Sequence, residues 1–389
     1  MTTPGSEPPI KQREGDAGNA MVAIDDHCAI ATRMSRQGLR GGIGDIAAVV
    51  RSLVGMQSQE FGYALWSVAQ RTAPGSDASH QVSKATMDTA FADGVLVRTH
   101  VLRLTWHFAL PEDIRWLLRL TVPRLKKLSA YYDRQLGLDD AVFARTNAVL
   151  ADAVSDGRHR TRAELSAVLD AAGIPASGQR AGNIMMRAEF DEVLISGAPR
   201  GKQHTYAAFD ERVPPDAGFD ADESLAELAR RFFTTRGPAT VKDLATWASL
   251  TLSQARRGLA QVESELDSAT LDGATVYLAA GALDAPRGEI DSPTVDLVQG
   301  YDEIVMSYSE SRGLLAGGAA YSPIAISSPY LHTILVDGIL VGHWRHRLGP
   351  DFAVIETALR RPLNRRENSA LLASVRWYGE YLGVPATLG

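Results

Sequence analysis

The apolar positions from residue 46 onward predict a helix whose buried face ends at an amide side chain. They recur at the 3.6-residue helical period and share one face: Ile46, Val49, Val50, Leu53 and Val54. Gln57 continues this face, although a buried amide is costly unless it is hydrogen-bonded. Gln59 adds a second amide, which a continuing helix would turn to nearly the opposite side. We therefore expect the helix to break near Gly55, so that extended backbone turns both amides toward one pocket.

The pattern further along the chain predicts three successive segments, each with two helices followed by a hairpin. In the middle segment, Thr161 and Glu164 form a capping box that opens the first helix. A second helical stretch follows, and strands are expected around 193–195 and 204–209.

The other two segments match this order. In the third segment, helices are expected from Thr240 and from Ser253, before a two-residue hairpin at Asp272-Gly273. The first segment runs from the helix at residue 46 through further helices to a hairpin after residue 94. A helix–turn–helix followed by a hairpin is the winged-helix pattern, which commonly binds DNA. Three copies in series are more specific evidence than one.

From residue 297 the chain changes to short apolar runs with turn signals, which predict a small sheet or barrel closed by a helix over 365–382. The predicted fold class is therefore α+β, with three tandem winged-helix modules and a C-terminal β-rich, barrel-like module. The expected divisions are a disordered tail (1–22), a first module with a helical extension (23–150), a second module (151–212), an acidic linker (213–228), a third module (229–284) and the C-terminal module (285–389).

Composition narrows the classes of protein. Hydrophobic content of 45% with 22% charged residues is typical of a soluble globular protein, and no apolar run is long enough for a membrane span. Cys28 is the only cysteine, which excludes an intrachain disulfide and any cysteine-based zinc or iron–sulfur site. The simplest expectation is a cytoplasmic protein.

The net charge of −6 is unusual for a DNA-binding protein, because phosphate contacts normally need a basic surface. Acidic residues concentrate between 210 and 227, so the remaining chain is near neutral and carries basic clusters. One cluster comprises Arg115, Arg119, Arg124, Lys126, Lys127 and Arg134, and the other Arg158, His159, Arg160 and Arg162. Each is either a solvated helix face or a track for phosphates.

Two predicted strands carry further candidates for DNA contact. In the first hairpin these are Arg98, His100 and Arg103, with covering of the hairpin edges as the alternative; Trp106 and His107 are expected to pack the module. In the C-terminal module they are His343, Arg345 and Arg347, which share one side of a strand, with a plain solvent face as the alternative.

Other kinds of site find no support in the sequence. His343 and His346 point to opposite sides of their strand, so a metal site is not expected. No phosphate-binding loop and no nucleophile-elbow motif is present, and no cofactor is expected.

Five stretches, in order, resemble one known family: VVRSLVGMQSQEFGYALWSVAQR, VRTHVLRLTWHFALPEDIRWLLRLTVPR, RFFTTRGPATVKDLATWASLTLSQARRGL, LVQGYDEIVMSYSESRGLL and VDGILVGHWRHRL. The family is that of the bacterial AlkZ-like DNA glycosylases, winged-helix enzymes with a Gln-x-Gln motif. The resemblance implies a C-shaped protein around a DNA channel, with Gln57 and Gln59 as the catalytic pair. Asp302 falls where the family also carries an acidic residue, either to orient a helix end or to line the channel.

The resemblance also implies the chemistry. An N7-alkylated purine is cationic and leaves readily, so two neutral amides can suffice to hold a water and stabilise charge on the sugar. The implied enzyme is a monofunctional DNA glycosylase without lyase activity, acting as a monomer on double-stranded DNA that carries N7-alkylguanine adducts. Gln at the second motif position favours the branch that removes bulky natural-product adducts or interstrand crosslinks and serves self-resistance.

Three alternatives stay open at this point. Gln57 could cap a frayed helix end while Gln59 is simply exposed. The amides could instead contact adenine edges in a winged-helix transcription regulator without catalysis, although the pair does not lie on the expected recognition helix 83–91. A damage-sensing scaffold that has lost catalysis is the third.

Overall fold

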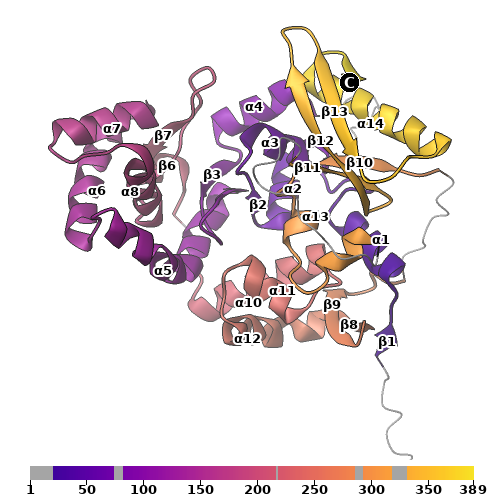
Figure 1. Cartoon of the computed structure of the whole chain (residues 1–389). Helices are drawn as coiled ribbons and strands as arrows, with labels where there is room; N and C mark the ends of the chain where they lie inside the picture. Colours follow the sequence, from indigo (N-terminus) through magenta and orange to yellow (C-terminus); the bar gives the residue numbers. More distant parts are fainter. Residues whose placement is uncertain (1–20, 74–81, 216–217, 285–291, 318–330) are drawn as a thin grey trace, which may run out of the picture.

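The structure, a computed structural model, describes residues 21–73, 82–215, 218–284, 292–317 and 331–389. Most of the predicted tail, residues 1–20, lies outside the described residues. Val22–Ala23 form a short strand, β1, beside the strand β8 (Leu266–Leu271). Helices and four small sheets occur together along the chain, which confirms the α+β class (Figure 1). None of the helices in the described ranges is long and apolar enough to cross a membrane.

The first predicted segment has two helices and a hairpin, as expected, and adds a short strand before them. Helix α2 (Ile46–Leu53) leads into the segment, and the elements that follow it are β2 (Met56–Gln57), α3 (Phe61–Ala69), α4 (Lys84–Asp93), β3 (Val97–His100) and β4 (Trp106–Ala109). The strands form a sheet of order β2-β4-β3. The long helix α5 (Pro111–Gln135) and α6 (Asp140–Val154) follow as the helical extension, and α1 (Asp26–Arg36) precedes the segment.

The second and third segments repeat this order. The second consists of β5 (Arg160–Thr161), α7 (Arg162–Ala171), α8 (Gly178–Phe190), β6 (Leu194–Ser196) and β7 (Thr205–Ala208), with sheet order β5-β7-β6. The third consists of α10 (Ala221–Arg236), α11 (Val241–Trp247), α12 (Leu252–Val262), β8 (Leu266–Leu271) and β9 (Ala274–Ala279). A bridge from Ala239 to Tyr277 takes the place of the first short strand.

The first segment departs from the other two at its first helix. In the later segments a threonine caps the helix, in the capping boxes Thr161–Glu164 and Thr240–Asp243; Thr161 is the last residue of the short strand, and Thr240 directly follows the bridge. In the first segment three residues separate β2 from α3, and the capping residue Glu60 makes no side-chain bond to the helix. The repeated fold therefore does not require the irregular backbone at residues 58–60.

The predicted acidic linker is wrong in its second half. After the short helix α9 (Phe209–Arg212), α10 begins at Ala221, within the segment expected to be a linker. Asp220 accepts hydrogen bonds from two backbone N–H groups of the first turn, and Glu223 bonds back to the backbone of Asp220. Acidic residues stabilise a helix N-terminus, so the second half of this acidic run begins a helix.

The C-terminal part is the β-rich module expected from the sequence. One five-stranded sheet runs in the order β10 (Val295–Val298), β11 (His332–Val336), β12 (Ile339–Leu348), β13 (Ala353–Leu359) and β14 (Ala386–Leu388). The Asp337-Gly338 turn has positive φ at both residues, as a two-residue hairpin requires. Helix α14 (Arg365–Leu382) has the predicted bounds, whereas β10 and β14 were not foreseen. The short helix α13 (Glu303–Met306) lies between β10 and β11 along the chain.

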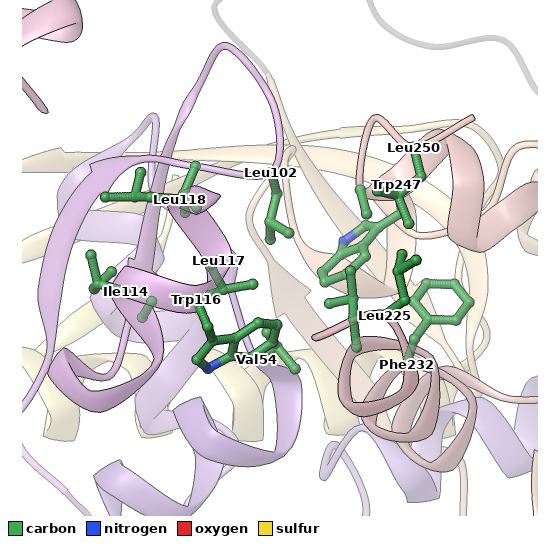
Figure 2. Packing of buried hydrophobic residues seen from close by; sticks show 14 of the residues in the cluster. Val54, Leu102, Ile114, Trp116, Leu117, Leu118, Leu225, Phe232, Trp247 and Leu250 are labelled. Carbon is green, nitrogen blue, oxygen red and sulfur yellow. The ribbon is translucent and has the colours of Figure 1, made fainter. Parts of the chain in front are cut away.

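Two shared cores hold the first segment in place. One joins α2, α3 and α4 to the C-terminal sheet and α14, so the first and last parts of the chain are packed as one body. The other joins α5 to α10, α11 and α12 and includes Val54, directly after α2 (Figure 2). Helices α6, α7 and α8 form a separate lobe beyond α5, with their own core (Figure 1). The end of α2 is therefore enclosed between two cores.

A buried histidine in the C-terminal sheet gives the fold an acid sensitivity. The His332 ring stacks on Tyr63, with 3.5 Å between ring centroids, and its Nδ1 accepts the N–H of Gly300 at 3.1 Å. Burial, followed by the charge of His346, lowers the pKa of His332 to about 3. The unfolded chain then binds more protons below pH 6.5, so stability is lost as pH falls from 6.5 toward 3. Protonation linked to a single such group lowers the free energy of unfolding by about 2 kcal/mol at pH 5, compared with neutral pH.

His332→Asn keeps an acceptor for Gly300 and removes the titration. We expect the difference in unfolding free energy between pH 7.5 and pH 5 to shrink by about 2 kcal/mol, measured by urea denaturation at both values. The variant loses the ring contact at both pH values, so that loss cancels in the difference. An undiminished difference between the two pH values would contradict this assignment.

Candidate active site

The backbone breaks where the sequence predicts. Helix α2 ends at Leu53 because Val54 adopts a left-handed φ of 62°, a strained conformation for a β-branched residue. At Gly55 a Cβ atom would lie 2.7 Å from a methyl group of the buried Leu102, so a larger residue would require the Leu102 side chain to shift. Extended backbone follows as β2, and Gln57 lies opposite His107 on β4. The predicted break near Gly55 is confirmed.

Gln57 is 3% exposed and is held by three different partners. Its backbone N–H donates to Glu303 Oε1 at 2.9 Å, and its backbone oxygen accepts from Gln299 Nε2 at 3.0 Å. Its side-chain Oε1 accepts from an Nη atom of Arg103 at 3.0 Å. Both its main chain and its amide are therefore fixed by residues distant in sequence, which contradicts the alternative of a cap on a frayed helix end.

Glu303 is the centre of this polar cluster. Its Oε2 accepts from Trp247 Nε1 at 2.6 Å, from Arg236 at 3.0 Å and from Ser307 Oγ at 3.2 Å. Burial alone would raise the pKa of Glu303, but the charges of Arg236 and Arg103 outweigh it and hold the pKa at about 2. The carboxylate is thus ionised, 1% exposed and fully engaged.

Arg236, the last residue of α10, connects this carboxylate to the broken helix. Its Nη2 donates to the backbone oxygens of Leu53 at 2.8 Å and Gly55 at 3.1 Å. Helix ends leave carbonyl groups without partners, and a buried guanidinium supplies the missing donors. Arg236 of the third segment therefore stabilises the backbone conformation of the first segment directly before Gln57.

Gln59 differs from Gln57 in its surroundings. It is exposed, and no described residue bonds to its side-chain amide. Between the two glutamines, Ser58 is buried, and its backbone oxygen accepts two bonds from Arg98, at 2.8 and 3.1 Å. Arg98 is itself stacked over Trp106, 4.3 Å from the ring centroid. That the two amides share one pocket stays a prediction.

Several buried polar atoms around Gln57 have no hydrogen-bond partner among the described residues. Four belong to its neighbours: Arg103 Nε, Thr105 Oγ1, His107 Nε2 and Gln299 Oε1. Buried polar atoms are normally paired, so such a concentration marks a place for water or a ligand. His107 shares a sheet face with Gln57, and burial, followed by the charge of Arg103, lowers its pKa well below the usual range. It is neutral, with Nδ1 bonded to the Thr105 carbonyl and Nε2 left as an acceptor.

The predicted DNA-contacting residues of the first hairpin all have internal partners. Arg98 donates to the backbone oxygen of Ser58, and Arg103 donates to the side-chain oxygen of Gln57. His100 is 8% exposed, and its Nδ1 lies 2.6 Å from the carboxylate of Glu189 on α8. Contact of these three with phosphate stays a prediction, but in this structure each turns inward. The expected packing role of His107 agrees with its complete burial.

The predicted group on β12 divides into two kinds of residue. Arg345 is half-buried and Arg347 is exposed, and both bond to Glu356 on β13. His343 lies on the same side but is 5% exposed. Burial, followed by the charge of Arg360, lowers its pKa to about 4, so it carries no charge at neutral pH. Within the described ranges, no three metal-ligating side chains come together.

Asp302 caps a helix, one of the roles expected for it. Its Oδ1 accepts the N–H of Ile304 at 3.0 Å, at the start of α13. It also forms a fully buried ion pair with Arg71, at 2.6 Å, and accepts from Ser67 Oγ at 2.5 Å. Asp302 thereby orients the helix that begins with Glu303, and so acts on Gln57 through its neighbour.

Comparison with known proteins identifies the family. The profile described as DNA glycosylase AlkZ-like matches residues 50–381, most of the chain, and the protein therefore belongs to this family of DNA glycosylases. Its fold is similar to the solved structure of the Streptomyces sahachiroi DNA glycosylase AlkZ, with a TM-score of 0.74 over 95% of this chain and 100% of that chain. The sequences are 20% identical, so this likeness concerns the fold alone. Among curated proteins no match was found.

Proposed function

We propose that this protein is a monofunctional glycosylase that hydrolyses the N-glycosidic bond of N7-alkylated purines in double-stranded DNA. The observation that carries the proposal is the neutral chemistry of the site. Among the described residues, the carboxylate that bonds to Gln57 belongs to Glu303, which is buried and occupied by Arg236, Trp247 and the Gln57 backbone. Glu303 is therefore closed to a substrate, which supports the amides of Gln57 and Gln59 as the reacting groups.

Such a site suits a substrate whose base departs without being protonated by the enzyme. Alkylation at N7 makes the purine cationic, and cleavage of its bond to the sugar returns the electron pair to the base, so no general acid is needed. A water held by the amides can then attack the oxocarbenium-like sugar. None of the described residues that bond to Gln57, Ser58 or Glu303 is a lysine, which is consistent with hydrolysis without a Schiff base and without lyase activity.

The three repeated segments support DNA as the partner. Each has the element order of a winged-helix module, and the proposal is that they curve around a duplex with Gln57 at the centre of the channel. Gln57 itself lies on a short buried strand and not on α4, the second helix of its module. This location disfavours reading of base edges by the amides, as a transcription regulator would do.

The two arginines of β12 allow a test of DNA binding. Arg345 and Arg347 both bond to the carboxylate of Glu356. If they meet the DNA backbone, replacing both by alanine should lower the salt dependence of binding, the slope of log affinity against log salt, by about 1 to 2. Glu356→Ala should tighten binding at low salt. Unchanged slopes in the double variant would place this face away from DNA.

The function itself is tested by an abasic-site assay. Duplexes that carry N7-methylguanine or a bulky N7-guanine adduct are incubated with the protein and then cleaved at abasic sites with alkali. Abasic product from either duplex supports the proposal, and a strong preference for the bulky adduct supports a role in resistance to DNA-alkylating natural products. No product from either, with tight binding to one undamaged sequence, would favour the regulator. Sedimentation of the protein with and without DNA tests the proposed monomer.

A further inference from the structure

We propose that Arg103 is a positioning residue that fixes the amide of Gln57 as a hydrogen-bond donor toward the substrate. The inference rests on the proposed function, because it assigns a direction to one of the two reacting amides. Its basis is a contact within the protein, at 3.0 Å, between a guanidinium nitrogen of Arg103 and Oε1 of Gln57.

The direction of the amide follows from the chemistry of its partner. A guanidinium has donors and no acceptor, so the atom of Gln57 that faces Arg103 has to be the oxygen. The –NH₂ group then points away from Arg103, and no described residue accepts from it. It is also not among the fully buried atoms that lack partners, so it is the end of the side chain that reaches solvent.

Arg103 is itself held in place, so the amide cannot simply turn over. Its Nη1 donates to the backbone oxygen of Trp247 at 2.7 Å, and its Nη2 lies 3.9 Å from the Glu303 carboxylate. The side chain is 16% exposed. Rotating the Gln57 amide by half a turn would place its –NH₂ against the guanidinium and leave a buried charge without its acceptor. Gln59, which is exposed, has no such constraint.

A fixed donor limits what Gln57 can do in the reaction. It can donate to the lone pair of the attacking water or to the departing base, which gains electron density as the bond breaks. It cannot accept a proton of the water. We assign the acceptor role to the carbonyl of Gln59, whose exposed side chain is free of the constraint on Gln57 and can turn toward the water. The glycosidic bond breaks with its electron pair going to the base, the water oxygen bonds to the sugar carbon, and the excess proton of the water leaves to solvent. The two glutamines consequently have different roles, and neither is chemically changed.

The first experiment replaces the hydrogen-bond donor of Gln57 by an acceptor and keeps the shape of the side chain. Gln57→Glu places an oxygen where the –NH₂ stands and forms an ion pair with Arg103, so the fold should be retained. We expect its single-turnover rate on N7-methylguanine DNA to fall by about 100-fold or more, as far as that of Gln57→Met, which has neither donor nor acceptor. A Gln57→Glu rate within about threefold of wild type would overturn the assignment.

The second experiment changes Arg103. Arg103→Met frees the amide to turn, so we expect the single-turnover rate per folded molecule to fall about tenfold while the dissociation constant for damaged DNA changes less than about threefold. Arg103→Lys keeps the charge and one donor but lacks the fork, and should recover part of the rate. Arg230→Met, which removes an exposed ion pair with Glu227 and Glu265, is the control for loss of an arginine.

The outcomes separate this inference from the proposed function. If the wild type yields no abasic product, the proposed function fails. If the wild type is active but Arg103→Met loses DNA affinity and keeps its rate, Arg103 is a DNA contact and the positioning role is wrong. A lowered rate in Arg103→Met with partial recovery in Arg103→Lys, together with an inactive, folded Gln57→Glu, supports the proposal.

Discussion

Replacing Gln57 and Gln59 together by alanine should lower the rate of base excision by about 10²- to 10³-fold, the usual effect of removing a preorganised dipole from an active site. Each single change should already lower turnover. The two single changes should differ in their effect on folding. Gln57→Ala leaves the guanidinium of Arg103 without its acceptor, which costs about 1–3 kcal/mol. Gln59 is exposed, so Gln59→Ala should leave stability nearly unchanged.

The measurement is the single-turnover rate of abasic-site formation, with enzyme in excess and the folded fraction of each variant determined in parallel. Gln37→Ala is a matched control: Gln37 is also buried and bonds to Tyr308 Oη at 2.8 Å, but it does not contact residues 57–59. It should lose stability and keep its rate. Wild-type rates in the double variant would remove the glutamines from the mechanism and leave the family membership intact.

Replacing Glu303 by alanine should destabilise the fold by about 3–5 kcal/mol, because one partner of a buried ion pair is removed and the other is left in place. The change leaves the guanidinium of Arg236 without its carboxylate and the indole N–H of Trp247 without its acceptor. It also frees the backbone N–H of Gln57, so the conformation of residues 55–60 should loosen. This loss is a large share of the 5–15 kcal/mol that stabilises a typical protein.

Urea unfolding of the variants checks this expectation. Removing both Glu303 and its closest cation, in Arg236→Met with Glu303→Met, should recover part of the lost stability, since the guanidinium of Arg236 is then no longer buried without its carboxylate. Glu356→Gln, which weakens an exposed ion pair, should cost less than about 1 kcal/mol and serves as the control. A loss below about 1 kcal/mol in Glu303→Ala would show that the carboxylate is not the centre of the site.

The sequence by itself determined the features that depend on neighbouring residues. The break of α2 near Gly55, the hairpin turns at Asp272-Gly273 and Asp337-Gly338, and the Thr161 capping box all occur where the local pattern predicts. These features follow from backbone conformations and bonds within a few residues. The same local rules failed for the acidic run before residue 228, because carboxylates favour both a solvated linker and the first turn of a helix.

The tertiary structure alone decided what surrounds the glutamines. Arg103 lies 46 residues from Gln57 along the chain, and Glu303 lies 246 residues away. The sequence marked Arg103 only as a candidate for phosphate, because a basic residue in a hairpin has the same pattern whether it turns outward or inward. Glu303, Arg236 and Gln299 carried one weak signal, polar side chains within largely apolar stretches.

The physical reason for this division is that a buried polar group is stable only beside a specific partner, and folding chooses the partner by packing distant segments together. The sequence could therefore show that Gln57 is an amide on a buried face, which needs a hydrogen bond. Which residue meets that need, and which end of the amide is left for a substrate, depends on how α10, α13 and the first hairpin pack around it.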